Sequence, residues 1–180
     1  TLYAAVYGTG VMKSLDGGST WALANTGLAN KRVMSIRSDP SDGTAQTLLV
    51  ATEGGGVFRT VDGAANWAAS NTGLQCGFVR NLRFVPAGGA FYSGAGYTAA
   101  ANHVYAATQC ELNSGVYRSV DGGVNWALLS TGMPAGTAVN NFQINSAGNN
   151  PAGQFIRATT LGAGVYQSND GGSSWNPING

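Results

Sequence analysis

The sequence is poor in charge, in cysteine and in histidine. Of its 180 residues, nine are Lys or Arg and eight are Asp or Glu, so charged residues make up 9% of the chain and the formal net charge is +1. An average soluble domain holds roughly 25% charged residues. A net charge this close to zero gives no electrostatic attraction toward nucleic acid or acidic membrane surfaces. We therefore expect neither as a partner.

Further absences narrow the structural class. No apolar run approaches the ~20 residues that cross a bilayer, so membrane insertion is not expected. No stretch shows a helical period of apolar residues, which leaves an all-β chain. An apolar fraction of 43% excludes intrinsic disorder, which requires low hydrophobicity together with high charge. With one histidine and two cysteines, we expect no His-cluster metal site, no Ser-His-Asp triad and no cofactor.

The chain is rich in glycine, with 28 residues, and it repeats. Four segments, which we call the turn boxes, share the pattern Ser/Thr-x-Asp-Gly-(Gly/Ala)-x-x-Trp and contain all four tryptophans: residues 14–21, 60–67, 119–126 and 168–175. An Asp carboxylate can accept hydrogen bonds from backbone N–H groups a few residues further on, and glycine tolerates positive φ. Each box therefore predicts a tight turn between two strands, less regular in the second box, where Ala64 replaces the second glycine.

The conserved pattern within the boxes predicts structural roles for their acids and tryptophans. The Trp follows the turn on the outgoing strand, where its apolar face can fill the wedge between neighbouring units. A Ca²⁺ ion takes six to eight oxygen ligands, whereas each box offers one carboxylate, so we expect no metal there. The predicted structural residues are Asp16, Trp21, Asp62, Trp67, Asp121, Trp126, Asp170 and Trp175.

Short alternating segments flank every box and predict strands. Two precede each box, one leaves from its Trp, and three copies have a further strand at 33–37, 79–84 or 139–144. The unit is thus four antiparallel strands, A to D, over about 50 residues, which is the blade of a β-propeller. We predict one propeller or propeller segment over residues 1–180, with blades at about 1–27, 28–73, 74–132 and 133–180. The first blade lacks its innermost strand A, and an A–B connection at 86–102 lengthens the third.

The boxes resemble the Asp-box, or BNR repeat, over essentially the whole chain. Such repeats occur in sialidases, xyloglucanase-type glycosidases, sortilin-like receptors and photosystem assembly factors, which do unrelated things on one scaffold. In the propellers that the chain resembles, sites generally lie near the axis, on the face that carries the D–A connections and B–C hairpins. Together with the expected axial position of strand A, the resemblance implies these candidate ligand-binding residues: Lys31, Arg32, Arg37, Glu53, Gln75, Gln109 and Glu111.

No complete catalytic set is recognisable. A sialidase uses three arginines to bind the substrate carboxylate, and the chain has three candidates in Arg37, Arg80 and Arg83. The residues around them do not match the sialidase motifs. Arg80 and Arg83 stand at an odd offset on one strand and are expected to point to opposite faces. Glu53 and Glu111 follow strand B in adjacent blades and could stand ~5–10 Å apart, as a glycosidase pair requires. The alternative is two solvated loop acids, which is the favoured interpretation.

Two classes of function remain. The favoured one is a non-catalytic extracellular binding or scaffold propeller that recognises carbohydrate or protein; the alternative is a glycoside hydrolase, or a fragment of one. Lys13, Arg59 and Arg118 occupy the same position of strand C in successive blades, which favours a structural role in the repeat over a basic recognition stripe.

The two cysteines predict a disulfide. Cys76 lies just before strand A of the third blade and Cys110 just after strand B. These strands are antiparallel neighbours about 4.8 Å apart, within the 4.4–6.8 Å that a disulfide requires between Cα atoms. The alternative is two free thiols. A disulfide and a surface with few charges favour a secreted or cell-surface protein.

Fifteen predicted strands leave one blade edge open, because four full blades need sixteen. A propeller normally closes its ring so that no strand edge stays unpaired. We therefore expect a homo-oligomer or a part of a larger chain or assembly. A tight four-bladed ring with one three-stranded blade is the alternative.

Overall fold

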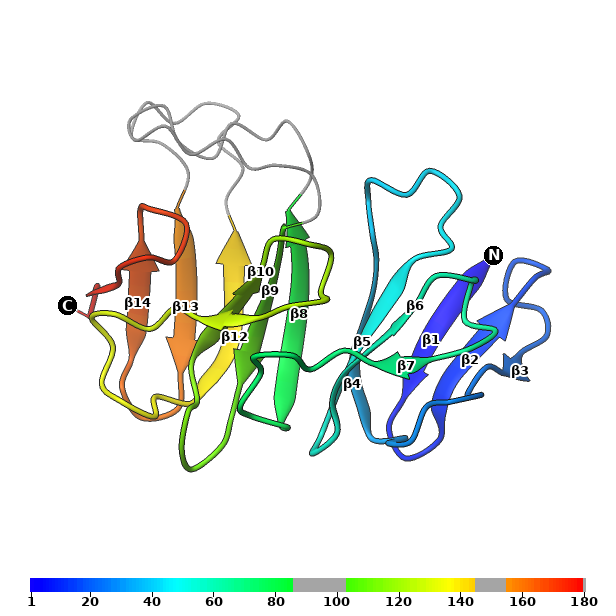
Figure 1. The fold of residues 1–180 in the computed structure, drawn as a ribbon, viewed down its shortest axis with the longest axis horizontal. Coiled ribbons are helices and arrows are strands. Elements are labelled where there is room, and N and C mark those ends of the chain that lie inside the picture. The colour runs from blue at the N-terminus through cyan, green and yellow to red at the C-terminus, as the bar shows by residue number, and fades with distance from the viewer. Residues whose placement is uncertain (86–102, 145–154, 180) are drawn as a thin grey trace.

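The structure is a computed structural model that describes residues 1–85, 103–144 and 155–179. Fifteen strands form four antiparallel sheets, which stand side by side with the two chain ends at opposite ends of the array (Figure 1). The predicted connection at 86–102 lies outside the described residues. No helix in the described ranges is long and apolar enough to span a membrane.

Each sheet is a meander of neighbouring strands, as the repeat predicts. Blade one contains β1 (Leu2–Val6), β2 (Gly10–Ser14) and β3 (Ala22–Leu23). Blade two contains β4 (Val33–Ser38), β5 (Leu48–Thr52), β6 (Gly56–Thr60) and β7 (Ala68–Ala69). Blade three contains β8 (Val79–Val85), β9 (His103–Thr108), β10 (Val116–Ser119) and β11 (Ala127–Leu128). Blade four contains β12 (Val139–Ile144), β13 (Ile156–Thr160), β14 (Val165–Ser168) and β15 (Asn176–Pro177). The predicted fold class, including the three-stranded first blade, is confirmed.

The core lies between blades rather than within one. Successive side chains of a strand point to opposite faces of its sheet. On β5, Val50 packs toward blade one in a cluster with Val11 and Trp67, while Leu49 packs toward blade three with Leu82 and Trp126. A third cluster joins blades three and four. Every residue of β5 and β9 is consequently buried.

The turn boxes are held by hydrogen bonds to their acids. In the third box the Ser119 hydroxyl donates to Asp121 Oδ1 at 2.7 Å, and the backbone N–H of Asn125 donates to the same oxygen at 2.9 Å. The Asn125 amide donates to Asp121 Oδ2 at 2.7 Å. Partial burial raises the pKa of Asp121, but the bonds from Asn125 and Ser119 outweigh it and hold the pKa at about 2. The carboxylate is therefore ionised at neutral pH and serves as an acceptor for the turn.

In the second box, where Ala64 replaces the second glycine, the turn has a longer hydrogen bond than in the other boxes. Ala64 stands at φ 68°, in the left-handed region that glycine occupies without a Cβ penalty. Its N–H lies 3.2 Å from the Thr60 hydroxyl, whereas the glycines of the other boxes make the same bond at 2.7–2.8 Å. The turn keeps its connectivity with a longer bond.

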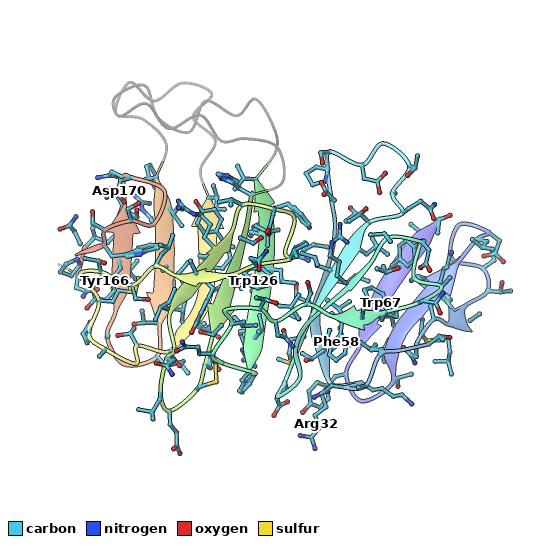
Figure 2. All side chains as sticks on the ribbon, in the orientation of Figure 1. Arg32, Phe58, Trp67, Trp126, Tyr166 and Asp170 are labelled. Carbon is cyan, nitrogen blue, oxygen red and sulfur yellow. A yellow bond between two sulfur atoms is a disulfide. The ribbon has the colours of Figure 1, made fainter. Side chains whose placement is uncertain are left out.

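Three of the four tryptophans lie between blades. Each donates its indole N–H to a carbonyl of the preceding blade: Trp67 to Ala24 at 2.8 Å, Trp126 to Ser70 at 2.9 Å and Trp175 to Leu129 at 2.9 Å. Trp67 and Trp126 can be followed in Figure 2. Trp21 instead donates to Gly18 of its own box and fills no wedge between the described blades.

The cation of strand C also bridges blades. Lys13, Arg59 and Arg118 each donate to the carbonyl of the first glycine in the next box, at 2.8, 3.2 and 3.2 Å. A backbone carbonyl is the acceptor in all three cases, so these side chains have a structural role at the blade interfaces. In blade four, Gln167 occupies this position.

The disulfide joins Cys76 and Cys110, whose Cα atoms are 5.8 Å apart, and no described cysteine is free. Cys76 is buried in the cluster between blades two and three, beside Val79 and Leu82. The bond ties the segment that enters β8 to the hairpin that leaves β9. It thereby fixes one end of blade three.

Candidate functional site

The innermost strand β8 lies between β4 and β12, and polar side chains of all three strands line one groove. Each strand has a β-bulge near its start, where its pairing with the neighbouring strand shifts by one residue. A bulge redirects side chains that strict alternation would place on opposite faces. We call the resulting set the inner-strand surface: Ser35, Arg37, Arg80, Asn81, Arg83, Asn140 and Asn141.

Hydrogen bonds between side chains link this surface across three blades. Arg37 donates to Asn81 Oδ1 at 3.2 Å, and the Asn81 amide donates to Asn141 Oδ1 at 2.5 Å. Arg80 donates to Asn140 Oδ1 at 3.3 Å, and Gln109 reaches the same oxygen at 3.4 Å. The asparagines hold the arginines in place and leave other guanidinium N–H groups available to a ligand.

The bulge corrects the expectation for Arg80 and Arg83. Arg80 is the extra residue between Val79 and Asn81, so the alternation that would separate it from Arg83 is broken. Arg80 bonds to Asn140 of β12, and Arg83 lines a cavity with Asn141 of the same strand. Both side chains therefore lie on the side of β8 that faces β12.

The inner-strand surface is positively charged. It borders a groove of about 490 Å³ whose other lining residues are Ala5, Met34 and Ile36. Burial lowers the pKa of Arg37, and the positive charge of Arg83 lowers it further. Among the residues that the structure describes, no Asp or Glu lines this groove or the neighbouring cavity. The arrangement can donate hydrogen bonds to carboxylates and to other acceptor-rich groups, as guanidinium groups do.

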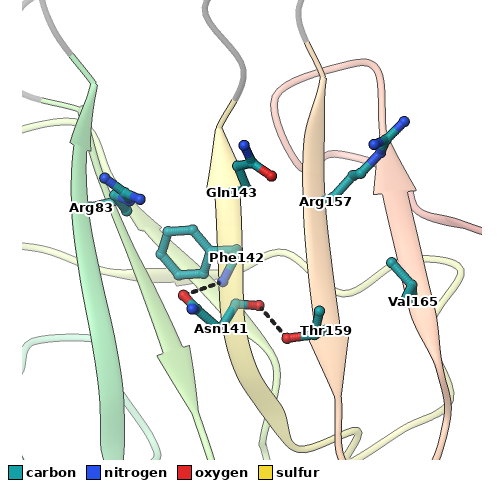
Figure 3. Close-up of a pocket in the computed structure, with 7 residues that line it drawn as sticks. All are labelled: Arg83, Asn141, Phe142, Gln143, Arg157, Thr159 and Val165. Carbon is teal, nitrogen blue, oxygen red and sulfur yellow. Dashed lines mark hydrogen bonds between the residues drawn. The ribbon is translucent and has the colours of Figure 1, made fainter.

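The neighbouring cavity has about 370 Å³ and extends from the inner strands onto the outer face of blade four (Figure 3). Arg83 of β8 and Arg157 of β13 stand on either side of β12, which contributes Asn141, Phe142 and Gln143. Thr159 donates to the Asn141 carbonyl at 3.3 Å. Beyond the inner-strand surface, this cavity adds the Arg157 cation and the Gln143 amide to the polar lining.

The D–A segments and the B–C hairpins meet at one end of the blades. Backbone N–H groups of the hairpins donate to carbonyls of the D–A segments, as Gly8 does to Lys31, Glu53 to Arg32 and Gln109 to Phe78. Arg32 projects at this end of the molecule (Figure 2). Gln75 is exposed next to Cys76 of the disulfide. The candidate residues on these loops thus share one rim.

Tyr7 joins this rim, although the sequence favoured a packing role for it and it was not among the candidate ligand-binding residues. Its hydroxyl donates to Glu53 Oε2, and this hydrogen bond raises the pKa of Tyr7. The residue lies on the β1–β2 hairpin, one blade away from Glu53. Only the placement of two blades side by side brings them together.

The two acids considered as a catalytic pair have different surroundings. Glu53 accepts from Tyr7 of blade one. Glu111 instead lines a separate cavity of about 370 Å³ with Met133, Ala135 and Gly136, on the way from blade three to blade four. Ser130 also lines this cavity, and among the described residues its Oγ is the buried side-chain atom without a hydrogen-bond partner. No contact of either glutamate supports the pairing that a glycosidase requires.

Within the described ranges, no three His, Cys, Asp or Glu side chains gather as metal ligands would. The single histidine, His103, is buried in β9. Burial lowers its pKa, and the charge of Arg118 lowers it further. The chemistry of the described site is accordingly that of arginine, amide and hydroxyl groups.

The asparagines of the inner strands were not among the candidates from sequence. Ser35, Asn81 and Asn141 occupy equivalent positions of the repeat, one residue after each bulge. Aligning the A strands of the three blades would have shown a polar position there. The bulges that turn these side chains toward the axis carry no clear motif.

Comparison with solved structures gives the fold class, a β-propeller. Similar structures include an ancestral GH74 enzyme (24% identity, TM-score 0.72), the GH74 enzyme of Niastella koreensis (14%, 0.66) and YCF48 bound to a D1 peptide (19%, 0.62). They match 99%, 99% and 98% of this chain, which spans 22%, 23% and 50% of theirs. No protein-family profile and no curated protein matches the sequence.

Proposed function

We propose that this chain is a non-catalytic, extracellular binding or scaffold propeller whose inner-strand surface recognises carbohydrate or protein. The observation that carries the proposal is the lining of the axial groove, where the described residues include Arg37 and Arg80 among asparagines and no acid. Its donors suit a ligand rich in hydrogen-bond acceptors and negative charge. The similar YCF48 structure holds a peptide, which supports a protein ligand on this fold.

The resemblance to GH74 enzymes supports the alternative, a glycoside hydrolase or a part of one. Such an enzyme needs two carboxylates that act on one bond. Glu53 and Glu111 lie in different surroundings, which weakens this candidate for the described residues. Incubation with a panel of polysaccharides decides between the two. Hydrolysis that is lost in both Glu53→Gln and Glu111→Gln would favour the enzyme.

Binding is tested on a glycan array that includes uronic acids and on an array of acidic peptides. Arg37→Ala and Arg80→Ala should each weaken the binding of a hit roughly tenfold or more, since a hydrogen bond to a charged group is worth about 1.5–3 kcal/mol. Leu112→Ala, at an exposed hairpin position, is the control and should leave binding unchanged. Binding that persists in both arginine variants would contradict the proposed site.

The extracellular location is proposed from the disulfide and from the low surface charge. Disulfides persist in oxidising compartments and are rare in the cytosol. Fractionation of the source cells under thiol-blocking conditions tests the location. We expect the oxidised protein in the secreted or cell-surface fraction, and a reduced protein confined to the cytosol would contradict this.

A further inference from the structure

The amide oxygens that line the axial groove already accept hydrogen bonds from the protein itself. An amide oxygen has two lone pairs and can accept two hydrogen bonds. Asn81 Oδ1 accepts from Ser35 at 3.4 Å and from Arg37 at 3.2 Å. Asn141 Oδ1 accepts from the Asn81 amide at 2.5 Å and from the backbone N–H of Phe142 at 2.8 Å (Figure 3). Both oxygens are therefore saturated.

The third amide of the groove is saturated in the same way. Asn140 Oδ1 accepts from Arg80 Nε at 3.3 Å and from Gln109 Nε2 at 3.4 Å. Guanidinium and backbone N–H groups donate and cannot accept, so each of the three amides must turn its oxygen toward them. Within the described part of the chain, the amide N–H groups of Asn140 and Asn141 make no hydrogen bond. They remain as donors for a ligand.

The arginines of the groove also keep unused donors and meet no carboxylate. A guanidinium group has five N–H donors. Arg37 uses two of them on the Ile36 carbonyl and on Asn81, and Arg80 uses one on Asn140. Neither arginine donates to an Asp or Glu side chain of the described residues. The guanidinium and amide groups of the groove therefore offer a ligand hydrogen-bond donors only.

Two arginines stand at equivalent positions of neighbouring innermost strands, although like charges repel. Arg37 pairs with Leu49 in blade two, and Arg83 pairs with Tyr105 at the same place in blade three. The positive charge of Arg83 lowers the pKa of Arg37. A bound anion would remove this repulsion, and no described carboxylate of the groove does so.

We propose that the ligand of the axial groove is a glycan that carries carboxylates, that is, a chain with uronic acid units. This inference rests on the proposed function of the inner-strand surface and names its ligand. An ionised carboxylate has acceptor oxygens only, and its two oxygens match the planar fork of a guanidinium group. The hydroxyl and ring oxygens of a sugar accept as well. A uronic acid can therefore meet a donor at every contact with the groove.

The donors of the groove disfavour the other ligands that this surface could take. A neutral sugar brings no charge to offset the two neighbouring arginines. A peptide carries a main-chain N–H donor on every residue except proline, and each such group needs an acceptor. An N–H turned toward the asparagines would meet amide oxygens that are already saturated. The chemistry of the groove thus favours a carboxylated glycan over both.

Titration calorimetry with three matched probes tests the class of ligand. The probes are oligogalacturonate, the same oligomer with its carboxylates methyl-esterified, and oligoglutamate with the same number of charges. We expect the unmodified protein to bind the acid form roughly tenfold or more tightly than the ester or the peptide. Binding of the acid form should also weaken as the salt concentration rises, because salt screens the attraction between exposed charges.

The variant Asn140→Asp replaces a free donor of the groove by a charge of the wrong sign. The new carboxylate can still accept from Arg80 and Gln109 at an exposed position, so the fold should be kept, which circular dichroism checks. Binding of oligogalacturonate should weaken roughly tenfold or more. Asn113→Asp makes the same change on the β9–β10 hairpin, where the side chain lines a separate cavity, and should leave binding unchanged.

The outcomes separate this inference from the proposed function on which it rests. Equal binding of acid and ester, tighter binding of the peptide, or no binding of any probe would each overturn the carboxylated glycan. The inner-strand surface stays the site if Arg37→Ala and Arg80→Ala still weaken the binding of the preferred ligand. Oligogalacturonate binding that is unaffected by Asn140→Asp and by both arginine variants would overturn the inference and the proposed function together, because the ligand would then bind elsewhere.

Discussion

Blades one and three have the same box and the same strand order, yet they differ in how that box is used. Trp126 of blade three is 5% exposed and bonds to blade two, whereas Trp21 of blade one is 39% exposed and bonds within its own turn. The sequences of residues 14–21 and 119–126 do not predict this difference. The comparison teaches that the box builds a turn by local hydrogen bonds, and that a neighbouring blade converts the turn into a core.

The largest expected effect separates the two tryptophans. Trp126→Ala should lower the free energy of unfolding by about 3–5 kcal/mol, the usual loss for a buried aromatic residue. Trp21→Ala should cost much less, because its side chain already contacts solvent. Urea unfolding of the two variants measures both losses. Equal losses in the two variants would break the comparison.

The disulfide should give the next largest effect. It closes a loop with a sequence separation of 34, for which the chain-entropy model gives about 3–4 kcal/mol. Reduction should therefore lower the urea midpoint of the unmodified protein. The double variant Cys76→Ala/Cys110→Ala starts at the lower midpoint and should not respond to reductant. A response there would assign the effect to something other than the disulfide.

Acid should destabilise all blades together through the box acids. The pKa values of Asp62 and Asp121 are held at about 2 in the folded state, below the ordinary value of 3.8. A depressed folded-state pKa stabilises the protein above the unfolded-state pKa, and this contribution is lost as the pH falls through the folded-state pKa. The contribution of the box carboxylates to the melting temperature should therefore be constant above about pH 5. The melting temperature should fall as the pH is lowered from about 4 to about 2. A flat profile down to pH 2 would contradict the hydrogen-bonded carboxylates.

The smallest effect should come from single box acids. Asp121→Ala removes the acceptor for Ser119 and Asn125 beneath a blade interface and should cost about 1–2 kcal/mol. Asp16→Ala breaks the same kind of turn in blade one, whose Trp21 bonds within its own box and to no other described blade, so the melting temperature should fall less. Thermal denaturation followed by circular dichroism compares them. A larger loss in the Asp16 variant would reverse the order that the comparison predicts.

Strands and turns could be predicted in detail because their causes are local. Gly56 to Thr60 alternates over one hairpin, and Asp62 accepts hydrogen bonds from Thr60 and Asn66 of its own box. The disulfide could be predicted because antiparallel neighbours place Cys76 and Cys110 at one end of a blade. The candidate site was less predictable. Tyr7 meets Glu53 across two blades, and Arg80 turns toward Asn140 through a bulge.

The sequence by itself determined the repeat, the hairpins, the acids that close the turns and the position of the disulfide, because each depends on residues that are near in the chain or paired in one sheet. Only the tertiary structure decided which tryptophans are buried and which arginines share the axial groove. Those properties depend on the packing of one sheet against the next. The period of a single strand distinguishes the two faces of its sheet, but it does not state what covers them.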